Sequence, residues 1–258
     1  MPINEKLKLI SKEKIANYIF KFSVLSEQMA KKAIPGQFLE IKVSETLDPF
    51  LRRPISIYNV DKEKGILEFI FMVKGRGTEL LAQKEPGDLI DIIGLLGGKG
   101  FEVKDYKNIA VIGGGIGIFP LHEFAKVAKE TAKVNMYIGF RNKDFVILEK
   151  EFTDVSDEFT LTTDDGSYGK SGFAINYLKD DCKNKNIDAI YACGPLPMLK
   201  AVQEFAIENN IPCQISLEEK MSCGIGTCMG CAVKLAGQDK YARVCKEGPI
   251  FEANEVEI

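Results

Sequence analysis

The apolar positions of the chain follow two different patterns, and the change lies near residue 100. Before it, short segments rich in Ile, Val and Phe are bounded by Gly, Pro or Asp, most clearly at residues 14–24, 37–43, 65–75 and 88–94. Several short strands separated by turn residues are typical of a sandwich or barrel. The first hundred residues therefore predict an antiparallel β-barrel domain.

Beyond a connector rich in Gly and Lys at residues 97–108, apolar strands alternate with helical stretches. Residues 108–130 predict a buried strand, a glycine loop and an amphipathic helix, and residues 188–210 repeat this order. Strands that alternate with helices indicate a parallel α/β sheet. Further strands of this sheet are predicted at residues 133–142, 159–167 and, as its last strand, 212–219.

The remaining chain, from about residue 216, is short, rich in cysteine and loop-like. A segment of this size cannot build a hydrophobic core of its own and needs a staple. We therefore expect three domains, which are a barrel over residues 1–100, an α/β domain over 101–215 and a small C-terminal domain over 216–258.

The composition narrows the class of protein. With 258 residues, of which 45% are hydrophobic and 28% charged, the chain has an ordinary globular composition, and its net charge of −3 gives no support to a nucleic-acid partner. It contains no run of 18 apolar residues that would span a membrane, and its charged first residues lack a secretory signal. We expect a cytoplasmic protein, whose seven cysteines are ligands or buried thiols rather than disulfides.

Four cysteines follow the spacing Cys223-x4-Cys228-x2-Cys231-x13-Cys245. This is the plant-type spacing with which four thiolates hold a [2Fe–2S] cluster. The intervening glycines permit the tight turns that direct several thiolates inward. The alternative is a structural zinc site, although such sites more often use two C-x2-C pairs. Cys182 and Cys213 lie outside the pattern, and we expect them to be ordinary buried or half-buried thiols.

The glycine loop at residues 111–121 follows a predicted strand and opens a helix, which is the context of a pyrophosphate-binding loop. It lacks the strict G-x-G-x-x-G fingerprint, and a tight strand–helix turn would also use glycines. The sequence "YACGPLPML" at residues 191–199 repeats the arrangement at a later strand end, where open parallel sheets bind ligands. Cys193 would lie near such a ligand, or it would be a packed thiol at the end of its strand.

Two motifs in the predicted barrel also suit an anion. "LRRPISIYNV" at residues 51–60 places arginines before a strand, so that Arg53 and Ser56 could reach a pyrophosphate together. "MVKGRGTELL" at residues 72–81 offers backbone N–H groups at a helix start. Each motif alone could equally be a surface arginine or a capped turn. Both together, ahead of a nucleotide-type sheet, favour a phosphate-bearing cofactor.

The chain resembles the ferredoxin–NADP reductase superfamily. The resemblance rests on five features in this order, which are the motifs RRPIS, GRGT, GGGIG and CGPLPM and the terminal cysteines. Within the superfamily, the chain most resembles the electron-transfer subunits of dihydroorotate dehydrogenase B, over essentially its whole length. The most specific part is "SLEEKMSCGIGTCMGC" at residues 216–231, because the core of the superfamily lacks this terminal cluster domain. The resemblance implies an FAD-binding barrel, an NAD(H)-binding α/β domain and a C-terminal [2Fe–2S] domain.

The resemblance also assigns residues to each cofactor. For FAD these are Arg53, Pro54, Ile55, Ser56, Ile70, Phe71, Met72, Gly77 and Thr78. For NAD(H) they are Gly113, Gly114, Gly115, Gly117, Cys193, Gly194 and Pro195. For the cluster they are Cys223, Cys228, Cys231 and Cys245. Two positions depart from the usual motifs, because Ile55 stands where an aromatic residue is common and Phe119 where a proline is common.

The implied activity is electron transfer in an NAD-dependent oxidoreductase of pyrimidine biosynthesis. An FMN-binding catalytic subunit would oxidise dihydroorotate, in a heterotetramer of two plus two, and electrons would pass through the cluster and FAD to NAD+. Related subunits serve hydrogenases, sulfide dehydrogenases or transhydrogenases as flavin and iron–sulfur diaphorases, so the partner stays open. A zinc-stapled nucleotide-binding module without redox turnover is the other alternative.

Two further assignments concern residues near the expected nucleotide site. Asp164 or Asp165 could bond a ribose hydroxyl and favour NAD over NADP, or could form an Asx turn before Gly166. We assign no chemistry to His122, the only histidine, which we expect at the surface or at the end of its helix.

Overall fold

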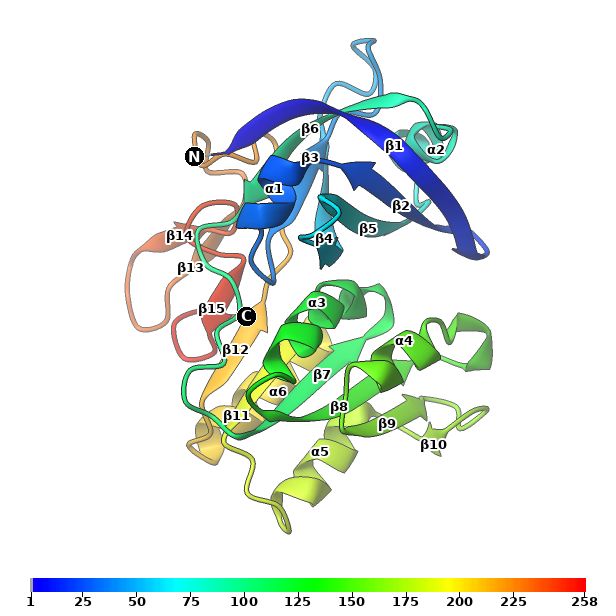
Figure 1. Ribbon diagram of the computed structural model, residues 1–258. Helices are drawn as coiled ribbons and strands as arrows, with labels where there is room; N and C mark the ends of the chain where they lie inside the picture. Colours follow the sequence, from blue (N-terminus) through cyan, green and yellow to red (C-terminus); the bar gives the residue numbers. More distant parts are fainter. Residues whose placement is uncertain (1) are drawn as a thin grey trace. The chain divides into compact units, whose positions relative to one another are not determined.

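The computed structural model describes residues 2–258, and the chain divides into two compact units (Figure 1). The first unit contains the chain up to Gly100 together with residues 218–232 and 242–249. The second contains residues 101–217, 233–241 and 250–258. The C-terminal segment thus contributes to both units, and the three domain boundaries expected from the sequence stay a prediction.

The first unit is built on a closed six-stranded barrel with strand order β1-β2-β5-β4-β3-β6, in which neighbours are antiparallel (Figure 1). Alternate side chains of each strand fill the barrel, among them Phe22, Leu39 and Phe69. The strands are β1 (Ile3–Ala16), β2 (Ile19–Leu25), β3 (Phe38–Ile41), β4 (Arg53–Asp61), β5 (Ile66–Met72) and β6 (Leu89–Leu96). Two short helices, α1 (Glu27–Lys32) and α2 (Arg76–Ala82), lie between strands. The predicted barrel is confirmed.

One predicted strand of the barrel is wrong in detail. Residues 14–24 contain the end of β1, a two-residue turn and β2, rather than a single strand. Tyr18 forms the turn with a φ of 63°, a conformation that the sequence does not signal with Gly or Pro. The apolar run therefore continues through a hairpin that the pattern alone does not separate.

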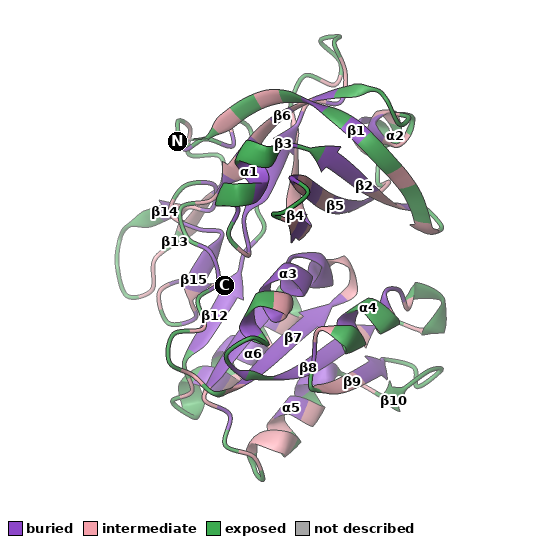
Figure 2. Cartoon of the chain, viewed as in Figure 1, coloured by how far each residue is buried: buried purple, intermediate pink, exposed green. Residues whose placement is uncertain are grey.

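The second unit contains a seven-stranded sheet with order β10-β9-β8-β7-β11-β12-β15. Its central strands are almost entirely buried, as expected when helices cover a parallel sheet (Figure 2). The parallel strands are β7 (Asn108–Gly114), β8 (Lys133–Phe140), β9 (Glu158–Thr163), β10 (Lys170–Ser171), β11 (Ala189–Cys193) and β12 (Cys213–Ser216). These strands confirm the predicted α/β domain.

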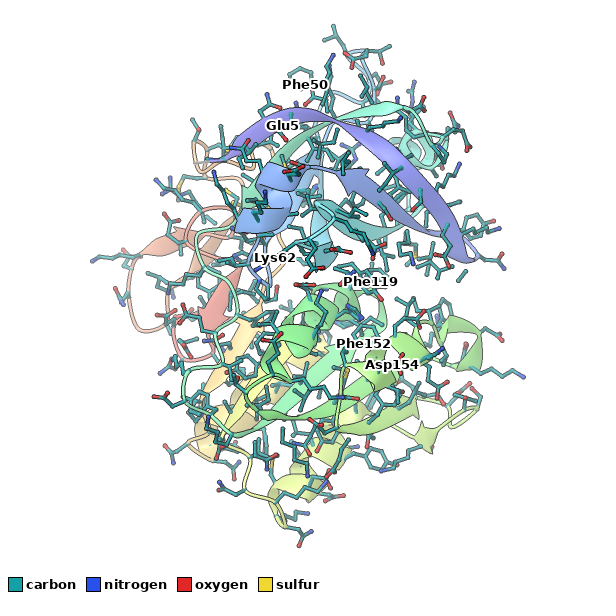
Figure 3. All side chains as sticks on the ribbon, in the orientation of Figure 1. Glu5, Phe50, Lys62, Phe119, Phe152 and Asp154 are labelled. Carbon is teal, nitrogen blue, oxygen red and sulfur yellow. The ribbon has the colours of Figure 1, made fainter. Side chains whose placement is uncertain are left out.

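The helical segments of this unit follow the strands. They are η1 (Gly115–Ile118), α3 (Phe119–Ala128), η2 (Lys143–Phe145), α4 (Glu149–Asp154), α5 (Ala174–Cys182) and α6 (Leu196–Glu208). His122 of α3 is buried and packs edge to face on Phe152 of α4, which is labelled in Figure 3. The expectation of a surface histidine was therefore wrong, because α3 is buried over most of its circumference, whereas the alternative of a position near the helix end holds, since His122 lies in the first turn of α3.

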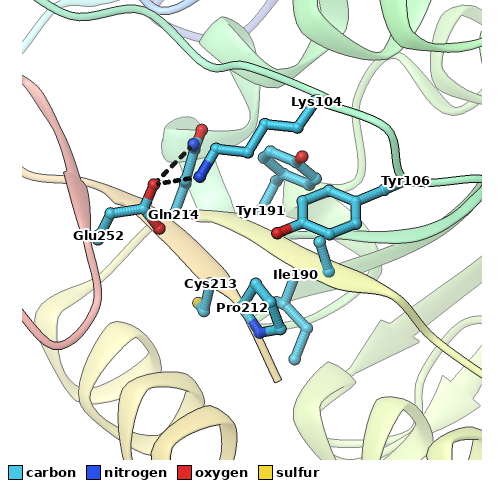
Figure 4. Close-up of a pocket in the computed structure, with 9 residues that line it drawn as sticks. Lys104, Tyr106, Ile190, Tyr191, Pro212, Cys213, Gln214 and Glu252 are labelled. Carbon is cyan, nitrogen blue, oxygen red and sulfur yellow. Dashed lines mark hydrogen bonds and ion pairs between the residues drawn. The ribbon is translucent and has the colours of Figure 1, made fainter. Parts of the chain in front are cut away.

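The sheet does not end at β12, as the sequence suggested. Strand β15 (Ile250–Glu252) pairs with it in the antiparallel direction. Glu252 accepts hydrogen bonds at 3.1 Å from Gln214 of β12 and from Lys104, as Figure 4 shows. A chain segment that leaves the sheet and returns after some thirty residues gives no local signal of its pairing, so the sequence pattern could not predict this strand.

A separate two-stranded sheet is formed by β13 (Ala232–Lys234) and β14 (Tyr241–Arg243), which follow β12 and precede β15 in the sequence. None of the helices described within residues 2–258 is both long enough and apolar enough to cross a membrane.

Candidate functional site

The four predicted cluster ligands come together in the first unit as two pairs of thiols. The Sγ atoms of Cys223 and Cys228 lie 3.3 Å apart, and Cys231 forms a hydrogen bond with Cys245. The second pair is buried, whereas the first is partly accessible. A [2Fe–2S] cluster takes four thiolates, two on each iron, so this division into pairs fits the cluster.

Backbone N–H groups of the loop point at the sulfur atoms. Gly226 donates to the Sγ of Cys245 at 3.2 Å, Thr227 to the Sγ of Cys223 at 3.3 Å and Gly230 to the Sγ of Cys228 at 3.5 Å. The loop bends toward the thiols because Gly224 and Gly226 adopt φ values of 65° and 81°, which side chains disfavour. Such donors stabilise thiolates and tune the potential of a bound cluster.

The loop is braced from the segment that supplies Cys245. Arg243 donates to the carbonyl oxygen of Gly226 at 2.5 Å and forms an ion pair of 2.6 Å with Glu247. Hydrogen bonds from Arg243 outweigh burial and lower the pKa of Glu247 to about 2. Arg243 therefore links the two segments that carry cluster ligands, a role that the sequence analysis missed because no motif marks it.

The thiols differ in acidity before any metal binds. Burial raises the pKa of Cys223, but hydrogen bonds from the backbone of Cys228, Ile225 and Thr227 and from the thiol of Cys228 lower it to about 6. Burial raises the pKa of Cys245 to about 12. Cys223 is therefore the more acidic of these two thiols.

The donor set suits a two-iron centre. The paired thiols, the N–H donors and the positive-φ glycines form a site that a [2Fe–2S] cluster fits. Cys223, Cys228, Cys231 and Cys245 would hold it.

The residues assigned to FAD lie along β4, β5 and the start of α2. Arg53, the first residue of β4, donates to the carbonyl oxygens of Leu51 and Arg52 at 2.6 and 3.2 Å. A Cβ atom on Gly77 would lie only 2.3 Å from the Nε of this arginine. The RRPIS and GRGT motifs, which are distant in the sequence, therefore meet at one place in the barrel unit.

Other FAD candidates lie around this place in different orientations. Thr78 caps the turn before α2, because its Oγ1 accepts from the N–H groups of Lys74 and Gly75 at 2.9 and 3.2 Å. Pro54 and Ser56 are half-buried on β4, and Ile55 packs against the barrel core. On β5, Phe71 belongs to that core, whereas the flanking Ile70 and Met72 alternate to the other side of the strand. Their contact with FAD stays a prediction.

We expect Gly77→Ala to weaken FAD binding without destabilising the barrel. The new methyl group must displace the guanidinium of Arg53, whereas alanine is a better helix former than glycine. Loss of one charge-assisted contact to a phosphate corresponds to an FAD affinity reduced about tenfold, measurable by flavin fluorescence on dilution. Gly139→Ala is the control, since Gly139 lies on β8 outside the FAD motifs and a Cβ there would meet its nearest atoms at 3.4 Å, an ordinary contact distance. Equal FAD affinities of the two variants would contradict the assignment.

The two nucleotide motifs of the second unit are in direct contact. Strands β7 and β11 are neighbours, with Gly113 opposite Cys193. A Cβ atom on Gly117 would lie 2.5 Å from the Cα of Gly194, and one on Gly114 would lie 2.9 Å from the Cδ of Pro195. The glycines therefore allow the loops after β7 and β11 to approach each other at the carboxyl edge of the sheet, where open α/β folds bind nucleotides. The remaining loop residue, Gly115, begins η1 with a φ of 55°.

Several single residues have the local contacts expected of their structural roles. Cys193 is 1% exposed at the end of β11, which agrees with a packed thiol, and its contact with NAD(H) stays a prediction. The Oδ1 of Asp165 accepts from the N–H and the hydroxyl of Ser167 at 2.9 and 2.6 Å, so this residue forms an Asx turn. Cys213 is buried and Cys182 half-buried, as expected.

Sequence analysis missed Glu40, the third residue of β3. Its side chain is 1% exposed, and both carboxyl oxygens lack a hydrogen-bond partner among the described residues. A Cβ atom on Gly224 would lie 2.5 Å from its Oε1, so Glu40 touches the cysteine loop. Burial raises the pKa of Glu40 to about 7, although Arg52 and Arg53 lower it. In the segment "QFLEIKV" such a glutamate looks like an ordinary solvent-facing strand residue.

Comparison with known proteins supports the two kinds of site at the level of domains. Residues 218–257 match the family model for the iron–sulfur cluster binding domain of dihydroorotate dehydrogenase B. Residues 111–204 match the model for the oxidoreductase NAD-binding domain. The first match contains the four paired thiols, and the second contains both nucleotide loops.

Curated relatives extend the likeness to the full length. The chain is 38% identical to the electron transfer subunit of dihydroorotate dehydrogenase B (NAD+) from Geobacillus thermodenitrificans, over 98% of each chain. It is 39% identical to the corresponding subunit from Caldanaerobacter subterraneus subsp. tengcongensis, over 97% of each. The chain belongs to the family of dihydroorotate dehydrogenase B electron transfer subunits. The resemblance inferred from the motifs is thus confirmed, together with the oxidoreductase class.

Solved structures agree with this family. A structure of an NADH-dependent reduced ferredoxin–NADP oxidoreductase, described for flavin-based electron bifurcation, matches with a TM-score of 0.88 and 33% identity, over 98% of this chain and 90% of that one. The ferredoxin–NADP+ reductase from Neisseria gonorrhoeae matches with a TM-score of 0.65 and 16% identity, over 80% of this chain and 91% of that one. The latter likeness concerns the fold alone and agrees with the predicted barrel followed by an α/β domain.

Proposed function

We propose that the chain transfers electrons between an FMN-binding dihydroorotate dehydrogenase subunit and NAD+, with FAD, a [2Fe–2S] cluster and NAD(H) as its cofactors. The overall reaction converts dihydroorotate and NAD+ into orotate, NADH and a proton. One observation carries the proposal: a barrel unit that contains both a paired-thiol site and an arginine–glycine site is joined to a sheet with contacting nucleotide loops.

Each cofactor is assigned to a different group of residues. When bound, the cluster supplies single-electron relay and FAD supplies the exchange between single electrons and a hydride. Arg53 and the loop at Gly77 would bind the FAD pyrophosphate, and the four cysteines would hold the cluster. The loops at Gly114–Gly117 and at Gly194 would receive NAD(H). No acid–base residue is needed for this chemistry, which agrees with the structural role of His122.

The cysteine loop offers a surface to a partner protein. Ile225 and Met229 lie between the ligands in sequence, and both side chains are exposed on this loop. Exposed apolar residues that lie together often mark protein interfaces. We assign this surface to the catalytic subunit, in a heterotetramer of two plus two. A cytoplasmic location belongs to the proposal, because a reducing compartment keeps the four ligand cysteines available to the cluster rather than in disulfides.

The second candidate partner is a subunit of an electron-bifurcating transhydrogenase. The structural match to the electron-bifurcating oxidoreductase covers 98% of this chain at 33% identity. A diaphorase subunit of a transhydrogenase would use the same cofactors and differ only in the protein that docks beside the cluster. The family model for the iron–sulfur domain favours a cluster over zinc at the four cysteines.

We expect the protein purified without oxygen to show flavin bands and broad iron–sulfur absorption, both bleached by NADH. Supplementation with the FMN-binding subunit should then give orotate formation that depends on NAD+. A colourless protein would contradict the cofactor set. A bleachable protein that does not support dihydroorotate oxidation with that subunit would favour the second candidate partner.

A further inference from the structure

Glu40 is buried, its carboxyl oxygens have no hydrogen-bond partner among the described residues, and it lies beside the cysteine loop. It lies on β3 between Leu39 and Ile41, which both point into the barrel core, so its side chain points to the opposite side of the strand. On that side it is covered rather than solvated, with 1% of its surface exposed. Its Oε1 lies against Gly224, the residue after Cys223.

Neither neighbouring arginine forms a hydrogen bond with this carboxyl group. Arg52 forms an ion pair of 2.7 Å with Asp91 and donates to the carbonyl oxygens of Glu40 and Asp91. Arg53 donates to two backbone carbonyls. Neither carboxyl oxygen of Glu40 has a hydrogen-bond partner among the described residues. A buried carboxylate without partners is strongly disfavoured, whereas a neutral carboxylic acid is tolerated and can donate one hydrogen bond.

A bound [2Fe–2S] centre with four thiolates is negatively charged and has sulfur atoms that accept hydrogen bonds. Its charge disfavours a second negative charge nearby, so the cluster itself would hold the acid neutral. A buried acid kept neutral so that it can donate is an established device of enzyme sites.

We propose that Glu40 is a positioning and tuning residue, which as a neutral acid donates a hydrogen bond to a sulfur atom of the cluster and thereby raises its reduction potential. The inference rests on the proposed function, since it requires a [2Fe–2S] cluster at the four cysteines. A donor to sulfur stabilises the reduced, more negative cluster, which gives the sign of the effect.

The test is a redox titration of the complete anaerobic protein, with the cluster followed by electron paramagnetic resonance and the flavin by absorbance. Glu40→Gln keeps a neutral donor and should leave the cluster potential near that of the unchanged protein. Glu40→Met has a similar length without a donor and should lower it. Glu45→Gln is the control, because Glu45 follows the same strand but is exposed and paired with Lys42. If Glu40→Met does not retain the cluster, Glu40→Asp, which withdraws the acid by one methylene group, should lower the potential instead.

The outcomes separate the alternatives by sign. If Glu40 is a buried negative charge, both Glu40→Gln and Glu40→Met will raise the cluster potential, and the proposal is overturned. A cluster potential that Glu40→Met leaves unchanged, or a shift of the flavin potential alone, also overturns the proposal. Absence of any cluster signal from the wild-type protein would instead contradict the proposed function. The failure of this inference and the failure of the proposed function are therefore distinguishable.

Discussion

Cys228→Ala is expected to remove the cluster and abolish electron delivery between the chain and its partner, while NADH still reduces the flavin. Cys228 supplies one sulfur atom of the accessible pair, and its Sγ lies 3.3 Å from that of Cys223. Loss of residues that merely orient metal ligands costs 10–100-fold in affinity or activity, so loss of a ligand should cost at least about a hundredfold. The arrangement of two thiols per iron leaves no spare sulfur to replace it.

Iron and sulfide analysis, with electron paramagnetic resonance of the reduced protein, measures the cluster. NADH oxidation with ferricyanide measures the flavin branch, and dihydroorotate-dependent NADH formation measures the whole path. Cys182→Ala is the control, because this half-buried thiol on α5 lies outside the ligand pattern. A Cys228→Ala protein with the iron content of the control would show that Cys228 is not a ligand.

Gly117→Ala is expected to reduce kcat/KM for NADH by about 10- to 100-fold, with FAD and cluster content unchanged. A Cβ atom at this position would lie 2.5 Å from the Cα and 2.8 Å from the N of Gly194, which are backbone atoms that cannot rotate away. The loops after β7 and β11 must therefore separate, and a misplacement of about 1 Å at a reacting centre can cost a hundredfold.

The matched control is Gly139→Ala on the neighbouring strand β8. Its Cβ would meet Ala174 and Thr162 at 3.4 Å, an ordinary contact distance. Stopped-flow reduction of the flavin by NADH gives the binding and transfer constants, and circular dichroism verifies the fold. Equal constants for the two variants would place the nucleotide elsewhere than at the contact between these loops.

Much of the site could be predicted because its signals are local. Cys223, Cys228 and Cys231 occur within nine residues, so their spacing alone indicates a cluster loop. The strand–glycine–helix order after residue 108 likewise indicates a tight strand–helix turn of the kind that can bind a nucleotide. The loops at Gly117 and Gly194 could be placed at one edge of the sheet because parallel strands present their carboxyl ends together.

Other features depend on contacts between distant segments, which periodicity does not encode. The return of β15 to the sheet is fixed by pairing with β12 and by Gln214 and Glu252. The meeting of Arg53 with Gly77 depends on the closure of the barrel. The burial of His122 depends on the packing of α4 over α3, because an amphipathic helix does not reveal how widely it will be covered.

The sequence by itself determined that barrel strands precede alternating strands and helices, and it determined the cysteine spacing and the two glycine motifs, since each arises from residues that are neighbours along the chain. Tertiary structure alone decided which thiols pair, because Cys245 joins Cys231 only through the segment held by Arg243. It also decided that Glu40 is buried, because the cysteine loop covers a strand position that alternation would leave in water. Local sequence sets backbone conformation, whereas the burial of a side chain and its charge pairing are set by the distant segments that pack against it in the folded protein.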